Sequence, residues 1–373
     1  MERALETVLK MKFKTVLIII ALTSGLIAGI NEATEEAAQT IRKFMRKHFI
    51  PGLSVTVANK GRIVWSQGFG YADKGNSEPV TPDTRMRIGS VSKTVTAAGV
   101  AILYEKGLLD LDAPVQKYVP SFPEKRWPIT TRQLMGHIAG VRHYRGDEML
   151  NNQFYPSVTA GLEIFSADTL LFQPRTGYSY SSYAWNLVSA IMENVAKQDF
   201  LTFMERNVFN PLGLYSISPE HRDSSLTNLA TFYNIRPLIN IADFHFFNIR
   251  REAPYVDNSY KWAGGGFVSN TRDLVIFGLA HFDETILNKE TISYWQTSMV
   301  TTDGESTNYG LGWRMGETES GGRWVGHSGG SVGGMAMLIL IPEEEFVIAI
   351  LVNSAPGGSL RQLSLDVSKH FLE

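Results

Sequence analysis

Segments with the apolar pattern of β-strands lie near both ends of this chain, and the middle has mostly helical patterns. Residues 53–69 hold two alternating runs around Asn59-Lys60-Gly61, which predicts a hairpin. Near the other end, residues 334–341 and 346–352 are almost continuously apolar, as is typical of central strands covered on both faces. A closing helix over about Ser359–Phe371 is expected to cover one face. This order predicts one α/β lobe built from both termini and one inserted helical lobe.

The chain is long enough for such a two-lobed core, since it has 373 residues, of which 44% are hydrophobic. We expect the fold class to be α/β (α+β), with an antiparallel sheet flanked by helices. The predicted α/β lobe covers about 34–93 and 265–373, and the helical lobe covers about 94–264. The cleft between the two lobes is the expected site.

Two further expectations concern the course of the chain. Tyr309–Trp313 and Arg323–Gly326 have the composition of strands. Residues 215–260 show weak periodicity and many aromatic side chains, which predicts an irregular segment over the cleft. A helix beginning at Thr34, a good N-cap residue, is expected to end at Pro51-Gly52.

Residues 1–33 have the pattern of a targeting segment. Lys10, Lys12 and Lys14 precede an uncharged run over 15–30, which is shorter than the roughly 20 residues that span a bilayer. A basic start, an apolar centre and small residues at the end are typical of a secretory signal peptide. We therefore expect export to the periplasm or the exterior. Two alternatives stay open, which are an uncleaved N-terminal membrane anchor and a mitochondrial targeting segment.

Charge and composition exclude several classes of function. The formal net charge is -2 without long runs of one sign, so nucleic acid is not an expected partner. The absence of cysteine excludes a thiol nucleophile, an iron–sulfur cluster and a disulfide. The eight histidines form no zinc-binding motif, so we expect neither a metal nor a cofactor.

Ser90 and Lys93 form the first candidate for catalysis. They precede the uncharged, helix-compatible run 94–103, and a helix opened by Ser90 places Lys93 on the same face. A serine hydroxyl needs a base beside it to act as a nucleophile. Burial and the positive end of the helix both lower the pKa of a lysine, so Lys93 can serve as that base.

Two later segments can complete such a site. Tyr180 lies in a hydroxyl-rich stretch, and a cation nearby would lower its pKa and suit it to proton transfer. Gly326-His-Ser-Gly-Gly330 lies between candidate strands, where a backbone N–H can join that of Ser90 in holding an oxyanion. The plainer interpretations are core tyrosines, a hydrogen-bonded histidine and a tight glycine turn.

Ser328 is a rival nucleophile, because its surroundings fit the Gly-x-Ser-x-Gly elbow of α/β-hydrolases. The elbow requires a helix directly after the serine. Ser331-Val-Gly-Gly334 and a strand follow here, which disfavours the elbow. Asp366 and His370 are the only downstream residues placed to complete its triad.

Three short motifs in order resemble the serine β-lactamase and penicillin-binding-protein family, in the branch with class C β-lactamases, D-amino-acid peptidases and related esterases. The motifs are Ser90-Val-Ser-Lys93, Tyr180-Ser-Ser182 and His327-Ser-Gly329. The resemblance covers about residues 35–373 and includes Lys261-Trp-Ala-Gly-Gly-Gly-Phe-Val-Ser269 and Tyr309-Gly-Leu-Gly-Trp313. Within the family, Tyr118–Lys125 and Val141–Tyr144 are most similar to LACTB-type proteins.

The resemblance implies a role for each motif. Ser90 would be the acylated nucleophile, Lys93 its base partner and Tyr180 the proton shuttle. His327, Ser328 and Gly329 would line the cleft, and Gly330 would give the second oxyanion N–H. Two departures stand out: Ser182 replaces the family's asparagine, which holds the acyl side chain, and His327 replaces its lysine. Histidine is mostly neutral at pH 7, which weakens the case for a β-lactam carboxylate as ligand.

The sequence therefore predicts a serine hydrolase that forms an acyl-enzyme with a small ester or peptide substrate. A true class C-like β-lactamase is one alternative. A scaffold or self-assembling protein on the same fold is the other, and the resemblance to LACTB-type proteins makes a homo-oligomer plausible.

Overall fold

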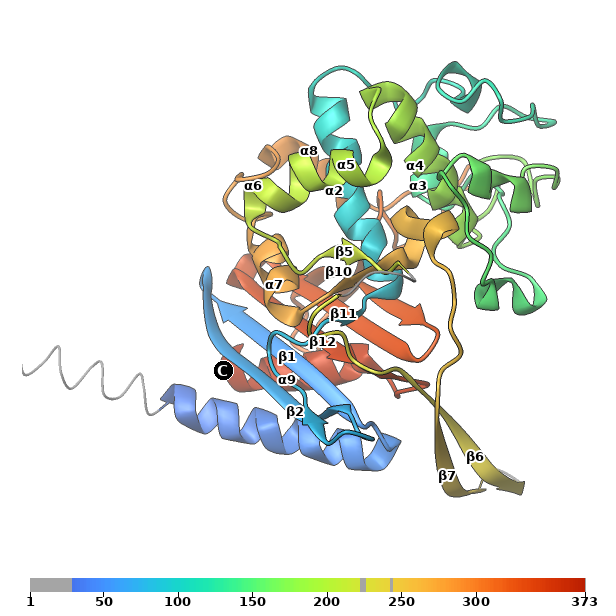
Figure 1. The fold of residues 1–373 in the computed structure, drawn as a ribbon. Coiled ribbons are helices and arrows are strands. Elements are labelled where there is room, and N and C mark those ends of the chain that lie inside the picture. Colours follow the sequence, from blue (N-terminus) through green and yellow to red (C-terminus); the bar gives the residue numbers. More distant parts are fainter. Residues whose placement is uncertain (1–28, 222–225, 242–243, 373) are drawn as a thin grey trace, which may run out of the picture.

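The two ends of the chain meet in one seven-stranded antiparallel sheet, with strand order β3-β2-β1-β12-β11-β10-β9 (Figure 1). The computed structural model describes residues 29–221, 226–241 and 244–372. The strands of this sheet are β1 Gly52–Asn59, β2 Arg62–Asp73, β3 Glu78–Pro79, β9 Arg314–Glu317, β10 Arg323–Ser331, β11 Gly334–Ile341 and β12 Phe346–Val352. The early and late strands join where Leu53 lies opposite Val352. The expected fold class, α/β (α+β) with an antiparallel sheet, is confirmed.

The central strands are buried on both faces, as their apolar sequences predict. Every residue of β12 is buried. Ile348 and Ile350 pack among residues of helix 29–48 and of α9 (Leu360–Leu372). Ala349 and Leu351, which point the other way because side chains alternate along a strand, join the core of the helical lobe.

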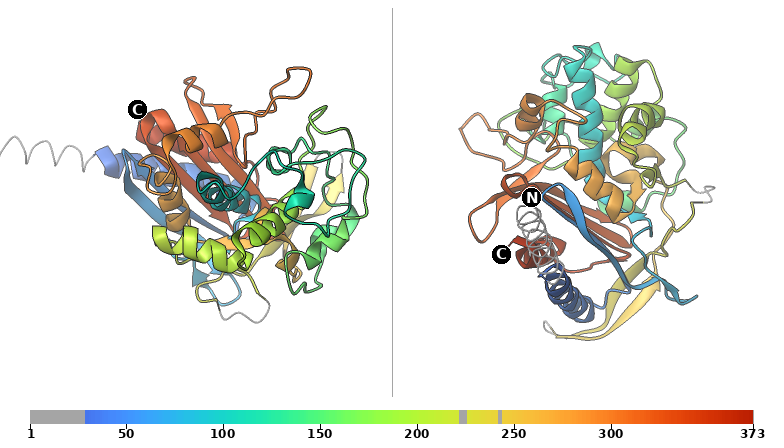
Figure 2. Two further views of the ribbon diagram at one scale, coloured as in Figure 1. Left: turned by 90° about the horizontal axis from the view of Figure 1, so that it is seen from above. Right: turned by 90° about the vertical axis from the view of Figure 1, so that its left-hand side faces the viewer.

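The two terminal helices lie side by side on one face of the sheet (Figures 1 and 2). His370 of α9 contacts Thr40 Oγ1 at 3.2 Å and Glu36 Oε2 at 3.2 Å. Helix 29–48 runs through Thr34, whose hydroxyl donates to the Asn31 carbonyl, so the expected start at Thr34 is wrong. Ser90 and the helix that follows it lie on the opposite face (Figure 1).

The other face carries the helical lobe. Its longest helices are α2 (Ser92–Glu105) and α4 (Ser182–Ala196). The remaining helices are α3 Thr131–Met135, α5 Phe200–Met204, α6 Asn210–Leu212, α7 Thr271–Leu279 and α8 Lys289–Trp295. The short helical turns are η1 Gly89–Val91, η2 Val115–Lys117, η3 Gly146–Leu150, η4 Ala160–Ile164, η5 Glu205–Phe209, η6 Ser259–Lys261, η7 Trp262–Gly266 and η8 Pro342–Glu344. Trp295 of α8 donates its indole N–H to the Ala97 carbonyl of α2, so α8 packs on the helical lobe although it follows residue 264.

The segment 215–260 is more regular than its sequence indicates. It contains a hairpin of β6 (Tyr233–Ile241) and β7 (Phe244–Glu252), which projects beside the sheet lobe (Figure 1). β6 pairs with the short strand β13 (Ser354–Ala355), next to the main sheet. A second small sheet joins β4 (Met86–Arg87), β8 (Phe267–Ser269) and β5 (Ser218–Pro219). The expected irregular course is therefore wrong for these strands.

Two other expectations need correction or lie beyond the description. Tyr309–Trp313 is a bend rather than a strand, and Gly312 adopts a φ of 92° there. Most of the predicted leader, residues 1–28, lies outside the described residues. Among the residues that the structure describes, no helix is both long and apolar enough to cross a membrane.

Candidate active site

Ser90 lies in the tight turn η1, directly before α2. Gly89 makes this turn possible, because its φ of 49° is a conformation that side chains with a Cβ disfavour. α2 begins at Ser92, two residues later than the sequence predicts. Lys93 nevertheless lies one turn from Ser90, with its Nζ 3.1 Å from Ser90 Oγ. The structure thus brings the predicted pair within hydrogen-bond distance.

Lys93 is completely buried and has three polar neighbours. Besides Ser90, its Nζ lies 3.2 Å from Ser182 Oγ and donates to the Gly264 carbonyl of η7. Burial lowers the pKa of Lys93 well below its usual value, and the positive charges of Arg314 and Lys261 lower it further. The predicted fall of the pKa is correct in direction, and two neighbouring cations contribute to it.

The lowered pKa of Lys93 favours an uncharged amine, and the three neighbours can accommodate one. A neutral amine has two N–H donors and one lone pair, and the Gly264 carbonyl can only accept a hydrogen bond. One donor then serves Gly264 and the other Ser182, which leaves the lone pair directed to the Ser90 hydroxyl. In this arrangement Lys93 can remove the proton of Ser90 directly.

Tyr180 lies beside this pair, and its ring lies close to the rings of His137 and His143. Its ring centroid is 5.0 Å from Lys93 Nζ and 4.3 Å from the His137 ring. Its hydroxyl is buried and has no hydrogen-bond partner of good geometry among the described residues. Burial raises the pKa of Tyr180, and this outweighs the lowering effects of Ser90 and Arg314. The expected fall of this pKa is therefore wrong, and Tyr180 is held as a neutral phenol.

His327 is buried and held from both sides. Its Nδ1 lies 2.6 Å from the Ser328 carbonyl, which can only accept, so Nδ1 carries the ring proton. Its Nε2 then accepts from the hydroxyl of Tyr309 at 2.8 Å. Burial lowers the pKa of His327 well below its usual value, and so do Lys93 and Arg314. His327 is thus held neutral, and both of its ring nitrogens are engaged by the protein. Its expected place in the lining of the cleft stays a prediction.

The backbone of β10 at Gly329 and Gly330, which carry no side chains, faces the turn of Ser90. A Cβ on Gly329 would lie 1.9 Å from the Ile88 carbonyl oxygen, and one on Gly89 would lie 2.8 Å from Gly330 N. Glycine at both positions lets β10 approach the turn that carries Ser90. A Cβ on Gly330 would meet nothing within 4 Å, so the space before Gly330 is open. The Gly330 backbone therefore lies between the turn of Ser90 and open space.

Ser328 lies within β10, where its exposed side chain alternates with buried neighbours. The strand continues to Ser331 and then turns into β11. The nucleophile elbow requires a helix at this point, so the rival interpretation of Ser328 is wrong. His370, which that triad would need, packs against helix 29–48.

Ser182 begins α4 and is nearly buried beside Lys93. Its backbone N–H donates to His143 Nδ1 at 3.1 Å. Burial lowers the pKa of His143 to about 4, and the charge of Lys93 contributes. Burial likewise raises the pKa of Tyr144, the next residue, to about 12, while the hydroxyl of Ser182 opposes that rise. Ser182, His143 and Tyr144 form one neutral, polar wall next to Lys93.

Sequence reasoning missed Arg314, a permanent cation at this site. Arg314 lies opposite Gly326 in the β9–β10 pair, and its guanidinium lies 5.1 Å from the centre of the Tyr180 ring. Its Nε is buried without a partner, and no ion pair of Arg314 is found among the described residues. The sequence did contain a signal for Arg314, because this residue directly follows the family-like stretch 309–313. The β9–β10 hairpin then places it opposite Gly326, next to His327.

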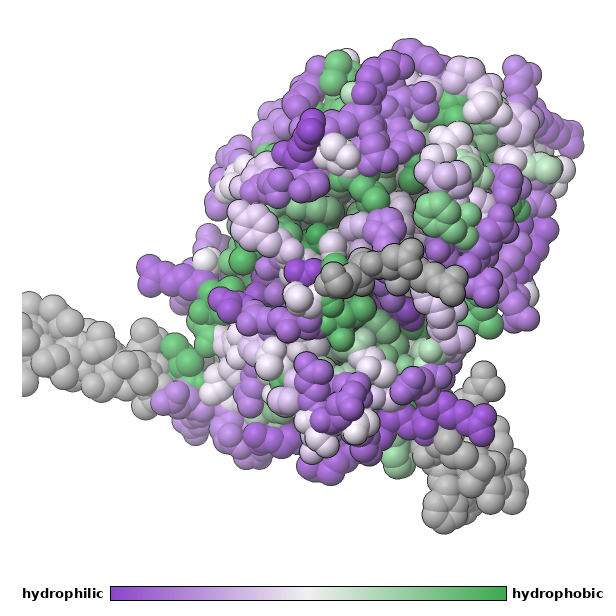
Figure 3. All heavy atoms as spheres, viewed as in Figure 1, coloured by the Kyte–Doolittle hydropathy of each residue, from purple (hydrophilic) through white to green (hydrophobic). Residues whose placement is uncertain are grey.

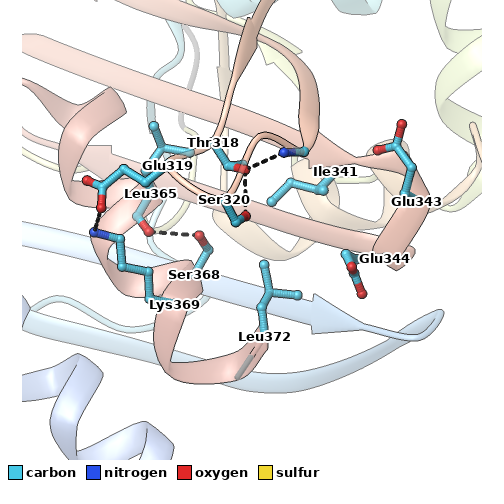
Figure 4. A pocket seen from close by; sticks show the side chains of 11 residues that line it. Thr318, Glu319, Ser320, Ile341, Glu343, Glu344, Leu365, Ser368, Lys369 and Leu372 are labelled. Carbon is cyan, nitrogen blue, oxygen red and sulfur yellow. Dashed lines mark hydrogen bonds and ion pairs between the residues drawn. The ribbon is translucent and has the colours of Figure 1, made fainter.

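A large cavity found among the described residues lies elsewhere. This cavity of about 560 Å³ lies between α9 and the loop before β10, and Lys369 in it pairs with Glu319 at 2.7 Å (Figure 4). Its serine next to that lysine, Ser368, donates to the Leu365 carbonyl, and no contact of a serine hydroxyl with the lysine is found there within the residues that the structure describes. Apolar residues gather where the two lobes meet (Figure 3). Within the described part of the chain, no group of three histidine or acidic side chains is arranged to hold a metal ion.

Comparison with known proteins identifies the family. The family model for Beta-lactamase matches residues 37–367. The human mitochondrial serine beta-lactamase-like protein LACTB is 28% identical over 84% of this chain and 72% of its own length. Penicillin-binding protein 4* of Bacillus subtilis is 26% identical over 87% of this chain and 73% of its own. The octameric penicillin-binding protein homologue from Pyrococcus abyssi shares the fold, with a TM-score of 0.77 and 24% identity over 91% of this chain and 77% of its own. The chain therefore belongs to the beta-lactamase family.

Proposed function

We propose that this protein is a serine hydrolase that forms an acyl-enzyme at Ser90 and acts on peptides or esters. The observation that carries the proposal is the contact between Ser90 Oγ and a buried Lys93 Nζ whose pKa is lowered. A nucleophile needs a base within about 2.6–3.2 Å, and this contact of 3.1 Å satisfies that condition.

The proposed reaction begins when Lys93 accepts the proton of Ser90 and Ser90 Oγ attacks the substrate carbonyl. The backbone N–H groups of Ser90 and Gly330 stabilise the oxyanion. Tyr180, as a neutral phenol, donates a proton to the leaving group and is reprotonated by Lys93. Water then attacks the ester bond to Ser90 and gives up its proton through the same groups, which releases the acid and restores the enzyme.

The free edge of β10 supports a linear substrate. β9 pairs with β10 only over residues 323–326, and residues 327–331 pair only with β11 in the main sheet. An extended chain can therefore lie along that edge and hydrogen-bond to the backbone. This favours a peptide or an extended ester.

Arg314 supports a leaving group that carries a carboxylate. The case against such a ligand rested on the replacement of lysine by the neutral His327. Arg314 supplies a permanent positive charge nearby, which a carboxylate can pair with. We therefore infer that a peptide with a free C-terminus is the best candidate, and a β-lactam is a weaker one because position 182 lacks the amide.

Labelling with a fluorophosphonate tests the proposal. The wild type should be labelled, Ser90→Ala should not, and Ser328→Ala should be labelled like the wild type. Labelling of Ser90→Ala would overturn the proposal. Substrate profiling with peptides, simple esters and a chromogenic cephalosporin then separates peptidase, esterase and β-lactamase activities, and turnover of the cephalosporin at tens per second would favour a β-lactamase.

Assembly and location remain separate proposals. The Pyrococcus relative is described as octameric and the human relative as mitochondrial. We propose that this chain is exported and forms homo-oligomers, while the mitochondrial and anchored alternatives stay open. Light scattering that shows only monomers over a range of concentrations would rule out the assembly, and fractionation with an antibody would identify the compartment. A scaffold without catalysis is disfavoured by the intact Ser90, Lys93 and Tyr180.

A further inference from the structure

Lys261 is a second buried lysine close to the site, and the reaction above does not use it. It ends η6, and three residues later the Gly264 carbonyl accepts a hydrogen bond from Lys93. Only 3% of Lys261 is exposed. Its Nζ lies 5.2 Å from the centre of the Tyr260 ring and 5.7 Å from that of Tyr144. Lys261 thus reaches the wall formed by Ser182, His143 and Tyr144.

The charge of Lys261 has no carboxylate bound to it. Among the described residues, no hydrogen bond or ion pair of its Nζ is found, and the rings of Tyr260 and Tyr144 lie near it. The nearby acids are already occupied. Glu220 accepts two hydrogen bonds from Arg87, at 2.6 and 2.7 Å. Asp257 accepts from the Ser259 N–H at 2.8 Å and from the hydroxyl of Tyr255 at 3.1 Å.

Lys261 remains largely charged at neutral pH. Burial and the charge of Arg87 lower its pKa to about 8, while Glu220 and Asp257 oppose the fall. A buried cation without a hydrogen bond carries a cost in free energy, which an acceptor on a ligand would offset. Two aromatic faces hold the amine in place but leave its N–H donors free.

The position of Lys261 matches a function missing from the sequence. The family's asparagine would present an amide to the acyl side chain, and this chain has Ser182 there. Ser182 Oγ is engaged with Lys93 at 3.2 Å and with the hydroxyl of Tyr144. Tyr144 links the two positions, because its hydroxyl hydrogen-bonds to Ser182 and its ring centre lies 5.7 Å from Lys261 Nζ.

We propose that Lys261 binds an anionic group, a carboxylate, on the acyl portion of the substrate. This inference rests on the proposed function and adds to it the substrate class, which is a peptide or ester whose acyl part carries an acidic side chain. Arg314, which approaches from β9, serves the leaving-group side, so the two cations recognise different parts of one substrate.

Two p-nitrophenyl esters of equal acyl length test the proposal, the mono-ester of adipic acid and the hexanoate. The acid-bearing ester should have the higher kcat/KM in the wild type, by about 10- to 100-fold, the range for one hydrogen bond to a charged group. Lys261→Met should lose this preference mainly through KM. The two esters are compared at the alkaline plateau of the pH profile, because loss of the Lys261 charge also raises the pKa of Lys93 and displaces the acidic limb equally for both. Lys261→Arg should keep most of it. Lys289→Met, at an exposed position, is the matched control and should behave like the wild type.

Each outcome has a distinct meaning. If kcat/KM of the wild type for the acid-bearing ester is no higher than for the hexanoate, the inference is overturned without any variant. Loss of the preference in Arg314→Met but not in Lys261→Met also overturns it. If Lys261→Met is not labelled by fluorophosphonate, its site is not assembled, and the comparison of Lys261→Arg with Lys261→Gln decides. If the wild type hydrolyses neither ester and Ser90 is not labelled, the proposed function itself fails.

Discussion

Arg142 and Lys93 are both buried basic side chains, but their surroundings are opposite. Arg142 donates to Asp168 at 2.5 Å and to Glu148 at 2.7 and 3.0 Å, so two carboxylates balance its charge. Lys93 has only neutral oxygens around it, and its nearest charged neighbours are the cations Arg314 and Lys261. A paired cation stabilises the fold. An unpaired one raises the free energy of the folded state and is available for chemistry.

The same distinction separates Arg87 from Arg314. Arg87 is clamped to Glu220 and to the Val332 carbonyl. Arg314, one strand away from the site's glycine wall, has no carboxylate among the described residues. Basic residues of the proposed site therefore differ from structural ones in having no carboxylate partner. This difference identifies the site residues better than their burial does, because both kinds are buried. The following variants test that distinction.

Replacing Lys93 should have the largest effect on activity. Lys93→Met removes the base, so kcat/KM should fall by about 10²- to 10⁴-fold. Stability at pH 7 should rise rather than fall. The pKa of Lys93 is lower in the folded protein than in the unfolded chain, so the unfolded chain binds more protons at neutral pH and folding is penalised. Esterase kinetics and urea unfolding measure the two effects, and a less stable but active variant would contradict the comparison.

Replacing Arg142 should have the opposite pattern. Arg142→Met leaves Asp168 and Glu148 without their partner, and both are less than one third exposed. The expected loss of stability is about 2–3 kcal/mol, below the value for fully buried pairs because water reaches both carboxylates. Urea unfolding measures the loss, and fluorophosphonate labelling of the folded fraction should be retained.

Replacing Arg314 should affect substrate choice. Arg314→Met should lower kcat/KM about 10- to 100-fold for a peptide with a free C-terminal carboxylate, because one charge-assisted contact is lost. At the alkaline plateau of the pH profile, the same peptide with a C-terminal amide should change little. Equal losses for both peptides would show that Arg314 acts on the site rather than on the carboxylate.

The smallest expected effect is a displacement of the pH profile. Activity requires neutral Lys93, so kcat/KM for a neutral ester should decline as the pH falls through the pKa of Lys93, which burial, Arg314 and Lys261 hold well below its usual value. Arg314→Met removes one positive charge and should raise that pKa, which moves the acidic limb to higher pH. Lys289→Met, which is exposed, should leave the limb in place. A limb that moves to lower pH would contradict this assignment.

Much of the fold could be predicted from sequence, because buried elements require a recognisable apolar pattern. Strands such as β11 and β12, packed on both faces, must be apolar throughout, and Ser90 and Lys93 are three residues apart in one turn. The hairpin β6–β7 escaped prediction. Among the described residues, its strand pairing with the rest of the molecule is limited to two residues of β13, which imposes little pattern on its sequence.

The charges of the site were harder to predict. Arg314 and Lys261 are distant from Lys93 in sequence, and only the β9–β10 pairing and η6 bring them near. Burial also reversed the expected direction for the pKa of Tyr180. A sequence pattern identifies which groups are present, while the balance between burial and neighbouring charge depends on the assembled structure.

The pairing of β1 with β12 has a consequence for how the protein is made. Leu53 and Val352 are neighbours across the sheet, yet nearly the whole chain separates them. Closing so long a loop is a late and slow event in folding. During synthesis, Ser90 leaves the ribosome long before Gly330 can reach it, so a nascent chain holds the proposed nucleophile without the proposed oxyanion site. Reaction of Ser90 with a fluorophosphonate should therefore begin only after the last strands have formed, and its time course reports completion of the fold.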